Sequence, residues 1–99
     1  MIIYLKNENF DELIKEGNVL VDFYADWCGP CVSLGEIIGE VINNNKDIKV
    51  IKIDVDKHNE LSRKYGVMSI PSIFLFKDGI QIKNNIGLME KEEFIEWIK

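Results

Sequence analysis

The sequence has 99 residues, of which 46% are hydrophobic, and its formal net charge is −5. This length fits one domain over residues 1–99, and the apolar content is too high for a disordered acidic chain. The negative charge, with no cluster of Lys and Arg, argues against nucleic acids and anionic membranes as main partners.

The first half of the chain alternates between strand and helix patterns. The short apolar segment Ile2–Leu5 predicts a strand, and a helix is predicted over about Asn7–Glu16, with Asn7 as its cap. The near-continuous apolar run Val19–Tyr24 is typical of a strand buried on both faces. Helical spacing then predicts a helix over about Cys31–Asn43, and alternation predicts a third strand over Ile48–Val55.

The second half adds one helix, a hairpin and a last helix. A short helix is predicted over Glu60–Tyr65, followed by a strand over Ser72–Phe76. The Asp78-Gly79 pair favours a tight hairpin turn because both residues tolerate positive φ. The hairpin returns as a strand over Ile80–Ile86, and an amphipathic helix is predicted over Met89–Lys99.

This order of elements predicts an α/β fold. Crossover helices make the first three strands parallel, whereas the hairpin makes the last two strands antiparallel. We therefore expect a mixed five-stranded sheet flanked by four helices, with helices on both faces. In such sheets the reactive site lies beyond the carboxyl end of a central strand, where a helix begins.

The only two cysteines, Cys28 and Cys31, lie at such a strand–helix junction. Their spacing brings both thiols to one side of a helix start, which favours a redox pair. Cys28 lies where unpaired N–H groups and the helix dipole stabilise a thiolate, so we expect it to be the exposed, attacking sulfur. Cys31 lies deeper and is the expected resolving thiol. Gly29 and Pro30 add no positive charge, which indicates a reductant.

The context of the pair favours a cytoplasmic protein. A structural disulfide is rare in a reducing cytosol, and no segment reaches the roughly 18 apolar residues of a membrane span. The apolar run after Met1 is too short for a secretion signal. We therefore expect a cytoplasmic monomer that uses its cysteines as a protein disulfide reductase.

Two other functions remain open at this stage. The thiols of two chains could share zinc in a bridged dimer, although this chain offers only His58 as a further typical ligand. Alternatively, the fold could serve as a non-catalytic docking or assembly subunit in which the thiols are incidental.

Asp22 interrupts the most apolar strand. Burial of a carboxylate raises its pKa, and a raised pKa suits proton transfer to and from Cys31. Alternatively, Asp22 lies on an exposed edge. Lys52, in the neighbouring strand, is either the partner of Asp22 or a surface residue.

The segment Phe23–Cys31 reads Phe-Tyr-Ala-Asp-Trp-Cys-Gly-Pro-Cys and resembles the active-site segment of the thioredoxin family. The similarity extends over nearly the whole chain, including Val21-Asp22-Phe23, Ile70-Pro71-Ser72 and the Phe76–Gly79 hairpin. It implies a thioredoxin fold, in which Asp22 is the proton-transfer residue and Lys52 its neighbour.

The resemblance also implies a target-binding surface and partners. The bond between Ile70 and Pro71 is expected to be cis, with Pro71 facing the cysteines. Beside this proline, the apolar contact surface consists of Trp27, Gly29, Pro30, Ile70, Ile86 and Gly87. No cofactor is implied beyond the Cys28–Cys31 disulfide. A thioredoxin reductase would supply electrons, and ribonucleotide reductase, methionine sulfoxide reductase and peroxiredoxin are implied targets.

The sequence departs from the family pattern at two positions. Val32 replaces the usual Lys or Arg after the second cysteine, which removes a charge from the rim of the site. Glu36 replaces the proline that usually bends this helix, and we expect Gly35 to permit a bend instead.

Overall fold

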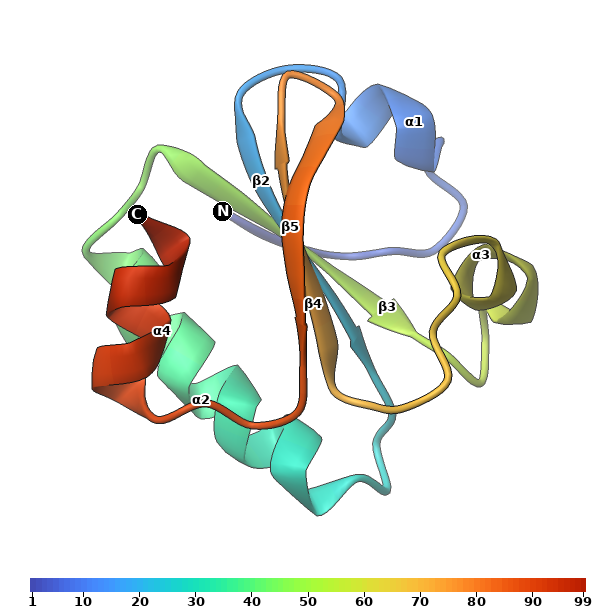
Figure 1. Cartoon of the computed structure of the whole chain (residues 1–99). Helices are drawn as coiled ribbons and strands as arrows, with labels where there is room; N and C mark the ends of the chain where they lie inside the picture. The colour runs from blue at the N-terminus through green and yellow to red at the C-terminus, as the bar shows by residue number, and fades with distance from the viewer.

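Five strands form a mixed sheet at the centre of the computed structural model, which describes residues 1–99 (Figure 1). The strands are β1 (Ile2–Tyr4), β2 (Asn18–Tyr24), β3 (Ile48–Asp54), β4 (Ser72–Lys77) and β5 (Ile80–Ile86). They lie in the order β1-β3-β2-β4-β5. The first three are parallel and β4 is antiparallel to both β2 and β5, which confirms the predicted mixed sheet.

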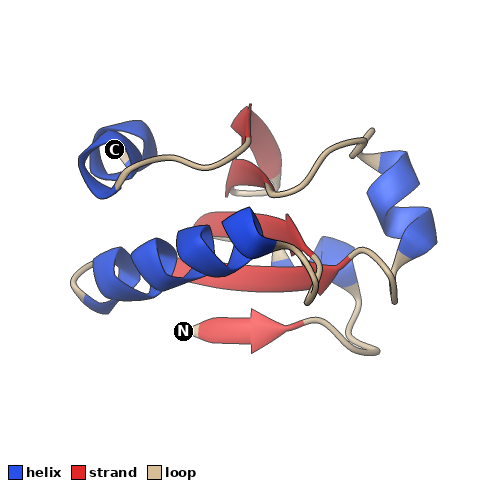
Figure 2. Ribbon diagram, turned by 90° about the horizontal axis from the view of Figure 1, so that it is seen from below, coloured by secondary structure: helices blue, strands red, loops and turns tan.

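Four helices cover the sheet. They are α1 (Phe10–Leu13), α2 (Gly29–Asn43), α3 (Asn59–Lys64) and α4 (Lys91–Ile98). Figure 1 shows α2 and α4 on one side of the sheet and α1 and α3 on the other, and the view in Figure 2 agrees. None of these helices combines the length and the hydrophobicity that are needed to span a lipid bilayer.

The side chains of β2 divide between two buried clusters, because successive residues of a strand point to opposite faces. Leu20 belongs to the cluster under α2 and α4, together with Ile38 and Phe94. Val21 and Phe23 belong to the cluster under α1 and α3. By the same alternation Asp22 points to the side of Leu20, toward α2.

The tip of the β4–β5 hairpin is held against the loop that precedes β2. Asp78 and Gly79 have φ values of 50° and 84°, as the Asp-Gly pair predicted. The Gly17 N–H donates to Asp78 Oδ1 (2.8 Å), and the Asp78 N–H donates to the Gly17 carbonyl (3.0 Å). These two hydrogen bonds connect residues that are 61 positions apart.

The first helix is shorter than predicted, and the assignment of Asn7 as its cap is wrong. The cap is Asn9, whose side chain accepts from the Glu12 N–H at 3.1 Å. The Glu8 carboxylate instead binds the Lys6 N–H at 2.7 Å and holds the preceding residues outside the helix. By contrast, α2 begins two residues earlier than predicted.

Candidate active site

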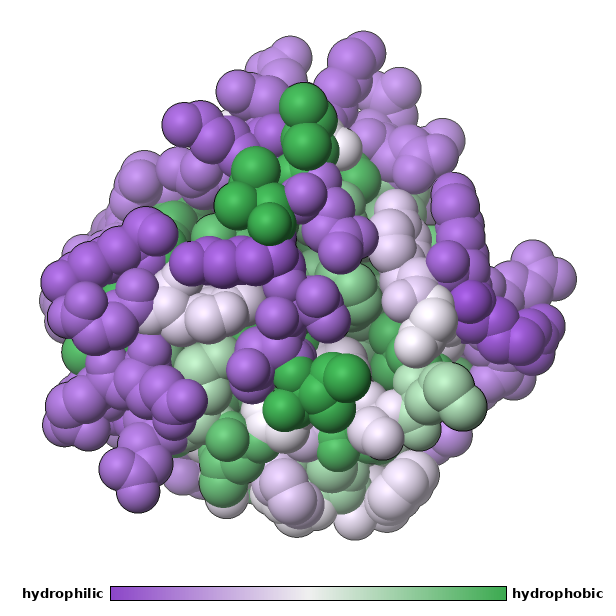
Figure 3. All heavy atoms as spheres, in the orientation of Figure 1, coloured by the Kyte–Doolittle hydropathy of each residue, from purple (hydrophilic) through white to green (hydrophobic).

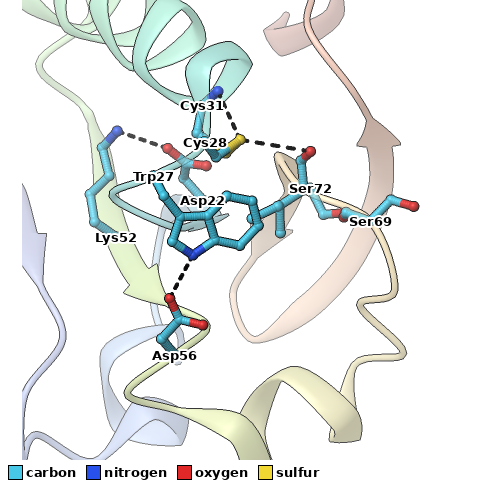
Figure 4. Close-up of a disulfide and its surroundings, with 9 residues drawn as sticks. Asp22, Trp27, Cys28, Cys31, Lys52, Asp56, Ser69 and Ser72 are labelled. Carbon is cyan, nitrogen blue, oxygen red and sulfur yellow. Dashed lines mark hydrogen bonds and ion pairs between the residues drawn. A yellow bond between two sulfur atoms is a disulfide. The ribbon is translucent and has the colours of Figure 1, made fainter.

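The site begins where β2 ends. After Tyr24 the chain turns and enters α2, and Cys28 is the N-cap residue of this helix. Cys28 and Cys31 are joined by a disulfide, with their Cα atoms 5.2 Å apart (Figure 4). The Cys31 N–H points at Cys28 Sγ from 3.2 Å. A helix N-terminus carries partial positive charge, so this place in the fold favours negative charge on Cys28 in the reduced state.

The prediction that Cys28 is the exposed sulfur is wrong for the disulfide form. Cys28 is only 5% exposed, which hardly differs from the 4% of Cys31. The two cysteines form a small buried cluster with Ala25, and Ile70 packs against this cluster. Neighbouring Gly29 and Pro30 are exposed, so the rim of the disulfide is open to solvent on this side. The two cysteines therefore differ in their position on the helix and not in their exposure.

Asp22 is buried, which excludes the alternative of an exposed edge carboxylate. It is 1% exposed, and its Oδ2 lies 2.7 Å from Lys52 Nζ. The other oxygen, Oδ1, has no hydrogen-bond partner. Burial raises the pKa of Asp22 above its usual range, and the nearby Lys52 ammonium only partly opposes this effect.

Gly35 gives Lys52 the space that it needs. Lys52 is itself buried, and a Cβ atom on Gly35 would lie only 3.3 Å from Lys52 Nζ. The helix α2 is continuous through Gly35 and Glu36. The lack of a side chain at position 35 therefore allows close approach of the lysine, a role that the sequence did not suggest.

A second group of predicted residues lies on the loop before β4. The bond between Ile70 and Pro71 is cis, as expected from the family resemblance. The Ile70 carbonyl oxygen lies 4.0 Å from Cys28 Sγ. The Pro71 carbonyl accepts from the Gly87 N–H at 2.8 Å, which brings the end of β5 to the same place.

Exposed apolar side chains accompany these residues. Trp27 is 73% exposed, and its indole N–H donates to Asp56 Oδ2 at 2.9 Å (Figure 4). Ile86 is exposed, and so are Met68 and Leu88, which the sequence reasoning missed. On the face drawn in Figure 3, hydrophobic side chains gather over the lower half, and a second group lies near the top. The chain positions of Met68 and Leu88, within two residues of Ile70 and Ile86, could have indicated them.

Nothing in the site supports shared zinc. Both thiols are bonded to each other, and no group of three or more His, Cys, Asp or Glu is placed to hold a metal ion. The one histidine, His58, lies with its Nε2 2.9 Å from the Leu5 carbonyl and serves to connect α3 to the end of β1.

Comparison with known proteins agrees with the fold and the motif. The sequence model of the family described as "Thioredoxin" matches residues 1–99. Thioredoxin of Mycoplasmoides gallisepticum is 44% identical over 90 residues, which cover 90% of either chain. Thioredoxin of Bacillus subtilis is 39% identical and covers 98% of this chain and 94% of its own.

Two solved structures extend this agreement to three dimensions. A mutant thioredoxin from Halobacterium salinarum is 36% identical with a TM-score of 0.87, covering 98% of this chain and 87% of its own. The second is 31% identical with a TM-score of 0.89, covering 98% of this chain and 92% of its own. This second structure is described as the structural basis of the thiol resolving mechanism in yeast mitochondrial 1-Cys peroxiredoxin via glutathione/thioredoxin systems.

Proposed function

Since this chain belongs to the thioredoxin family and is a thiol–disulfide oxidoreductase, we propose that Cys28 attacks target disulfides and that Cys31 resolves the intermediate. The observation that carries these roles is the N-cap position of Cys28, with the Cys31 N–H directed at its sulfur from 3.2 Å. A thiolate at that place gains a hydrogen bond and the favourable end of the helix dipole, whereas Cys31 lies inside the helix.

The reaction proceeds in two exchanges. The Cys28 thiolate attacks one sulfur of the target disulfide, the target S–S bond breaks, and the second target sulfur leaves as a thiolate that takes up a proton. Cys31 then loses its proton and attacks Cys28 Sγ. The mixed disulfide breaks, the reduced target leaves, and the Cys28–Cys31 disulfide forms. Two electrons pass from the cysteine pair to the target, and the pair itself is the redox group.

Asp22 is the proposed acceptor of the Cys31 proton. Its raised pKa brings the carboxylate closer to the proton affinity that such a transfer needs. Lys52, at 2.7 Å, holds the carboxylate in place and limits the rise in its pKa. In the reverse reaction, when a reductase opens the disulfide, Asp22 returns the proton.

The proposed target surface consists of exposed or half-buried residues around Cys28, together with the buried Pro71. Its members are Trp27, Gly29, Pro30, Ile70, Pro71, Ile86 and Gly87. Met68 and Leu88 extend it with further apolar side chains. An extended target segment would bury its own apolar side chains on this surface.

The partners follow from the family. The family implies disulfide-containing proteins as targets and a reductase that reduces the Cys28–Cys31 disulfide again. We propose a thioredoxin reductase as the electron donor, and ribonucleotide reductase, methionine sulfoxide reductase and peroxiredoxin as electron acceptors. The two-exchange reaction uses no metal or other cofactor. We propose that the chain acts as a single-domain monomer in the cytoplasm.

Substitution of each cysteine in turn tests the assignment of roles. Cys28→Ser removes the attacking thiolate, and we expect complete loss of insulin-disulfide reduction with dithiothreitol as electron donor. Cys31→Ser leaves attack intact but removes the resolving thiol, so mixed disulfides with targets accumulate and are detected on non-reducing gels.

The double variant Cys28→Ser, Cys31→Ser is the control, because it forms no mixed disulfide at either position. The roles are reversed if Cys28→Ser, and not Cys31→Ser, traps targets. Full biological activity of the double variant would instead point to a docking subunit.

A further inference from the structure

A groove of about 340 Å³ lies next to the disulfide, and apart from Cys31 and Lys52 its lining residues have no part in the proposed reaction. It runs beside Cys31, between the first turns of α2 and the strands β1, β2 and β3. Tyr4 and Tyr24 form aromatic walls, with ring centroids 6.3 Å apart and planes nearly perpendicular. Val32 and Gly35 line the side of α2, and Gly35 leaves the groove open because it has no side chain.

The charges of the groove are predominantly negative. Asp26 and Glu36 line it, are exposed, and form no ion pair with any lysine or arginine of the chain. The one cation in the groove is Lys52, whose ammonium is bonded to the buried Asp22. Even when Asp22 is protonated, the carboxylates of Asp26 and Glu36 and the ammonium of Lys52 give the groove a net charge of −1.

The aromatic walls also suit a cation. Lys52 Nζ already lies 5.8 Å from the centre of the Tyr24 ring, which shows that this ring accepts a cation within the usual range. Tyr4 is exposed and offers a second ring at the outer wall. Val32, at the rim, places no positive charge where it would repel an incoming cation.

We propose that the groove binds a lysine or arginine side chain of the target protein, close to the disulfide that is being reduced. This inference rests on the proposed function, because Cys31 borders the groove and any molecule held at the disulfide presents its neighbouring residues there. A cationic side chain would place its charge between Asp26 and Glu36 and its methylene groups along the tyrosine rings. The groove thereby selects targets with a basic residue near their disulfide.

Target peptides that differ in a single charge test the proposal. Each peptide contains one intramolecular disulfide and carries Lys, Gln or Glu at one position within two residues of either cysteine. The reduced protein is mixed with each peptide, and its oxidation is followed by tryptophan fluorescence. At the best position we expect the Lys peptide to react about fivefold faster than the Glu peptide at low ionic strength. About 1 M salt should abolish this preference.

Variants of the protein locate the preference in the groove. Glu36→Gln and Asp26→Asn should each lower the ratio of Lys to Glu rates, and Val32→Lys should bring it to one or below. Glu40→Gln is the matched control, because Glu40 lies one turn further along α2 and pairs with Lys91 at 3.2 Å, outside the groove. It should leave the ratio unchanged.

Two results would overturn the inference. The first is equal reduction of the Lys and Glu peptides at every position, which leaves disulfide reduction itself intact. The second is a preference for Lys that survives in the Asp26→Asn, Glu36→Gln double variant. Failure of the wild-type protein to reduce any of the peptides would instead contradict the proposed function.

Discussion

On the face covered by α1 and α3, β2 and β3 bury only apolar side chains, whereas on the face covered by α2 and α4 the same strands bury Asp22 and Lys52. The first face is completed by interlocking aromatic rings, among them Phe10, Phe74 and Phe76. The second face supports the disulfide. The difference shows that one strand can bury an apolar row on one side and a paired carboxylate on the other, because its side chains alternate between the faces.

Removal of a ring from the aromatic face should have the largest effect on stability. Phe76 is buried, with ring centroids 6.2 Å from Phe10 and 6.0 Å from Tyr65. Phe76→Ala leaves a cavity among these rings and should lower the free energy of unfolding by about 3–5 kcal/mol, measured by urea denaturation of the oxidised protein. Activity per folded molecule should hardly change.

Phe76→Leu is the matched variant for this test, since it keeps most of the volume and should cost less than the alanine variant. A loss of activity in Phe76→Leu that matches the loss in a variant of Asp22 would contradict the separation of the two faces.

A change at Asp22 should act in the opposite way, with a large effect on the reaction and a pH-dependent effect on stability. Asp22→Asn removes the proposed proton acceptor of Cys31 and should slow resolution of mixed disulfides about tenfold or more near neutral pH. Rapid mixing of the reduced protein with a disulfide target measures this step. An unchanged rate would exclude Asp22 from proton transfer.

The sign of the stability effect follows from the raised pKa of Asp22. The folded protein holds this proton more tightly than the unfolded chain, whose carboxyl has the ordinary pKa of 3.8. The contribution of Asp22 to stability is therefore complete below pH 3.8 and falls as the pH rises toward the folded pKa. The difference in unfolding free energy between wild type and Asp22→Asn should show this fall. In Lys52→Met the contribution of Asp22 to stability should persist to higher pH, because the ammonium that opposes the rise in its pKa is gone.

The smallest effect is expected from two glycines of α2. At Gly39 a Cβ atom would meet no atom within 4 Å apart from its chain neighbours and the local backbone of its own helix, so Gly39→Ala should stabilise the helix by about 0.5–1 kcal/mol. Gly35→Ala should give the same gain in helix propensity as Gly39→Ala, but the new Cβ would lie 3.3 Å from Lys52 Nζ. We expect this contact to cancel the gain and to weaken the pairing of Lys52 with Asp22.

Thermal unfolding of both variants measures the difference, and the pH at which Asp22 titrates provides a second measurement. Only Gly35→Ala should move that pH upward. Equal stabilisation by the two substitutions, with no change in the titration of Asp22, would show that Lys52 adjusts freely.

Local patterns in the sequence predicted the buried strands and the cysteine pair. The apolar run of β2 indicates its burial, and the cysteine spacing marks the helix start. The alternation in β3 predicted the strand but not the burial of its polar residues Lys52 and Asp54. The first helix was less predictable, because Asn7 and Asn9 are both reasonable caps. Two hydrogen bonds decide between them: the Glu12 N–H donates to the Asn9 side chain, and the Lys6 N–H donates to the Glu8 carboxylate.

Contacts between distant segments could not be predicted in this way. Ile70 lies beside Cys28 although it is 42 positions further along the chain, and only the family resemblance, not a local pattern, indicated this. The bond from Trp27 to Asp56 spans 29 positions, and no motif indicates it. The close approach of Lys52 to Gly35 depends on how α2 lies over β3, which the amino-acid types of these elements do not specify.

The two hydrogen bonds between Gly17 and Asp78 join the loop before β2 to the β4–β5 turn, at the end of β2 that is far from the disulfide. In the strand register that they fix, Ile73 of β4 lies opposite Asp22. A slip of β4 by a single position would exchange Ile73 for Phe74 and bring an aromatic ring to the face of the carboxylate. The immediate neighbours of the buried acid thus depend on a contact between two loops at the opposite margin of the sheet.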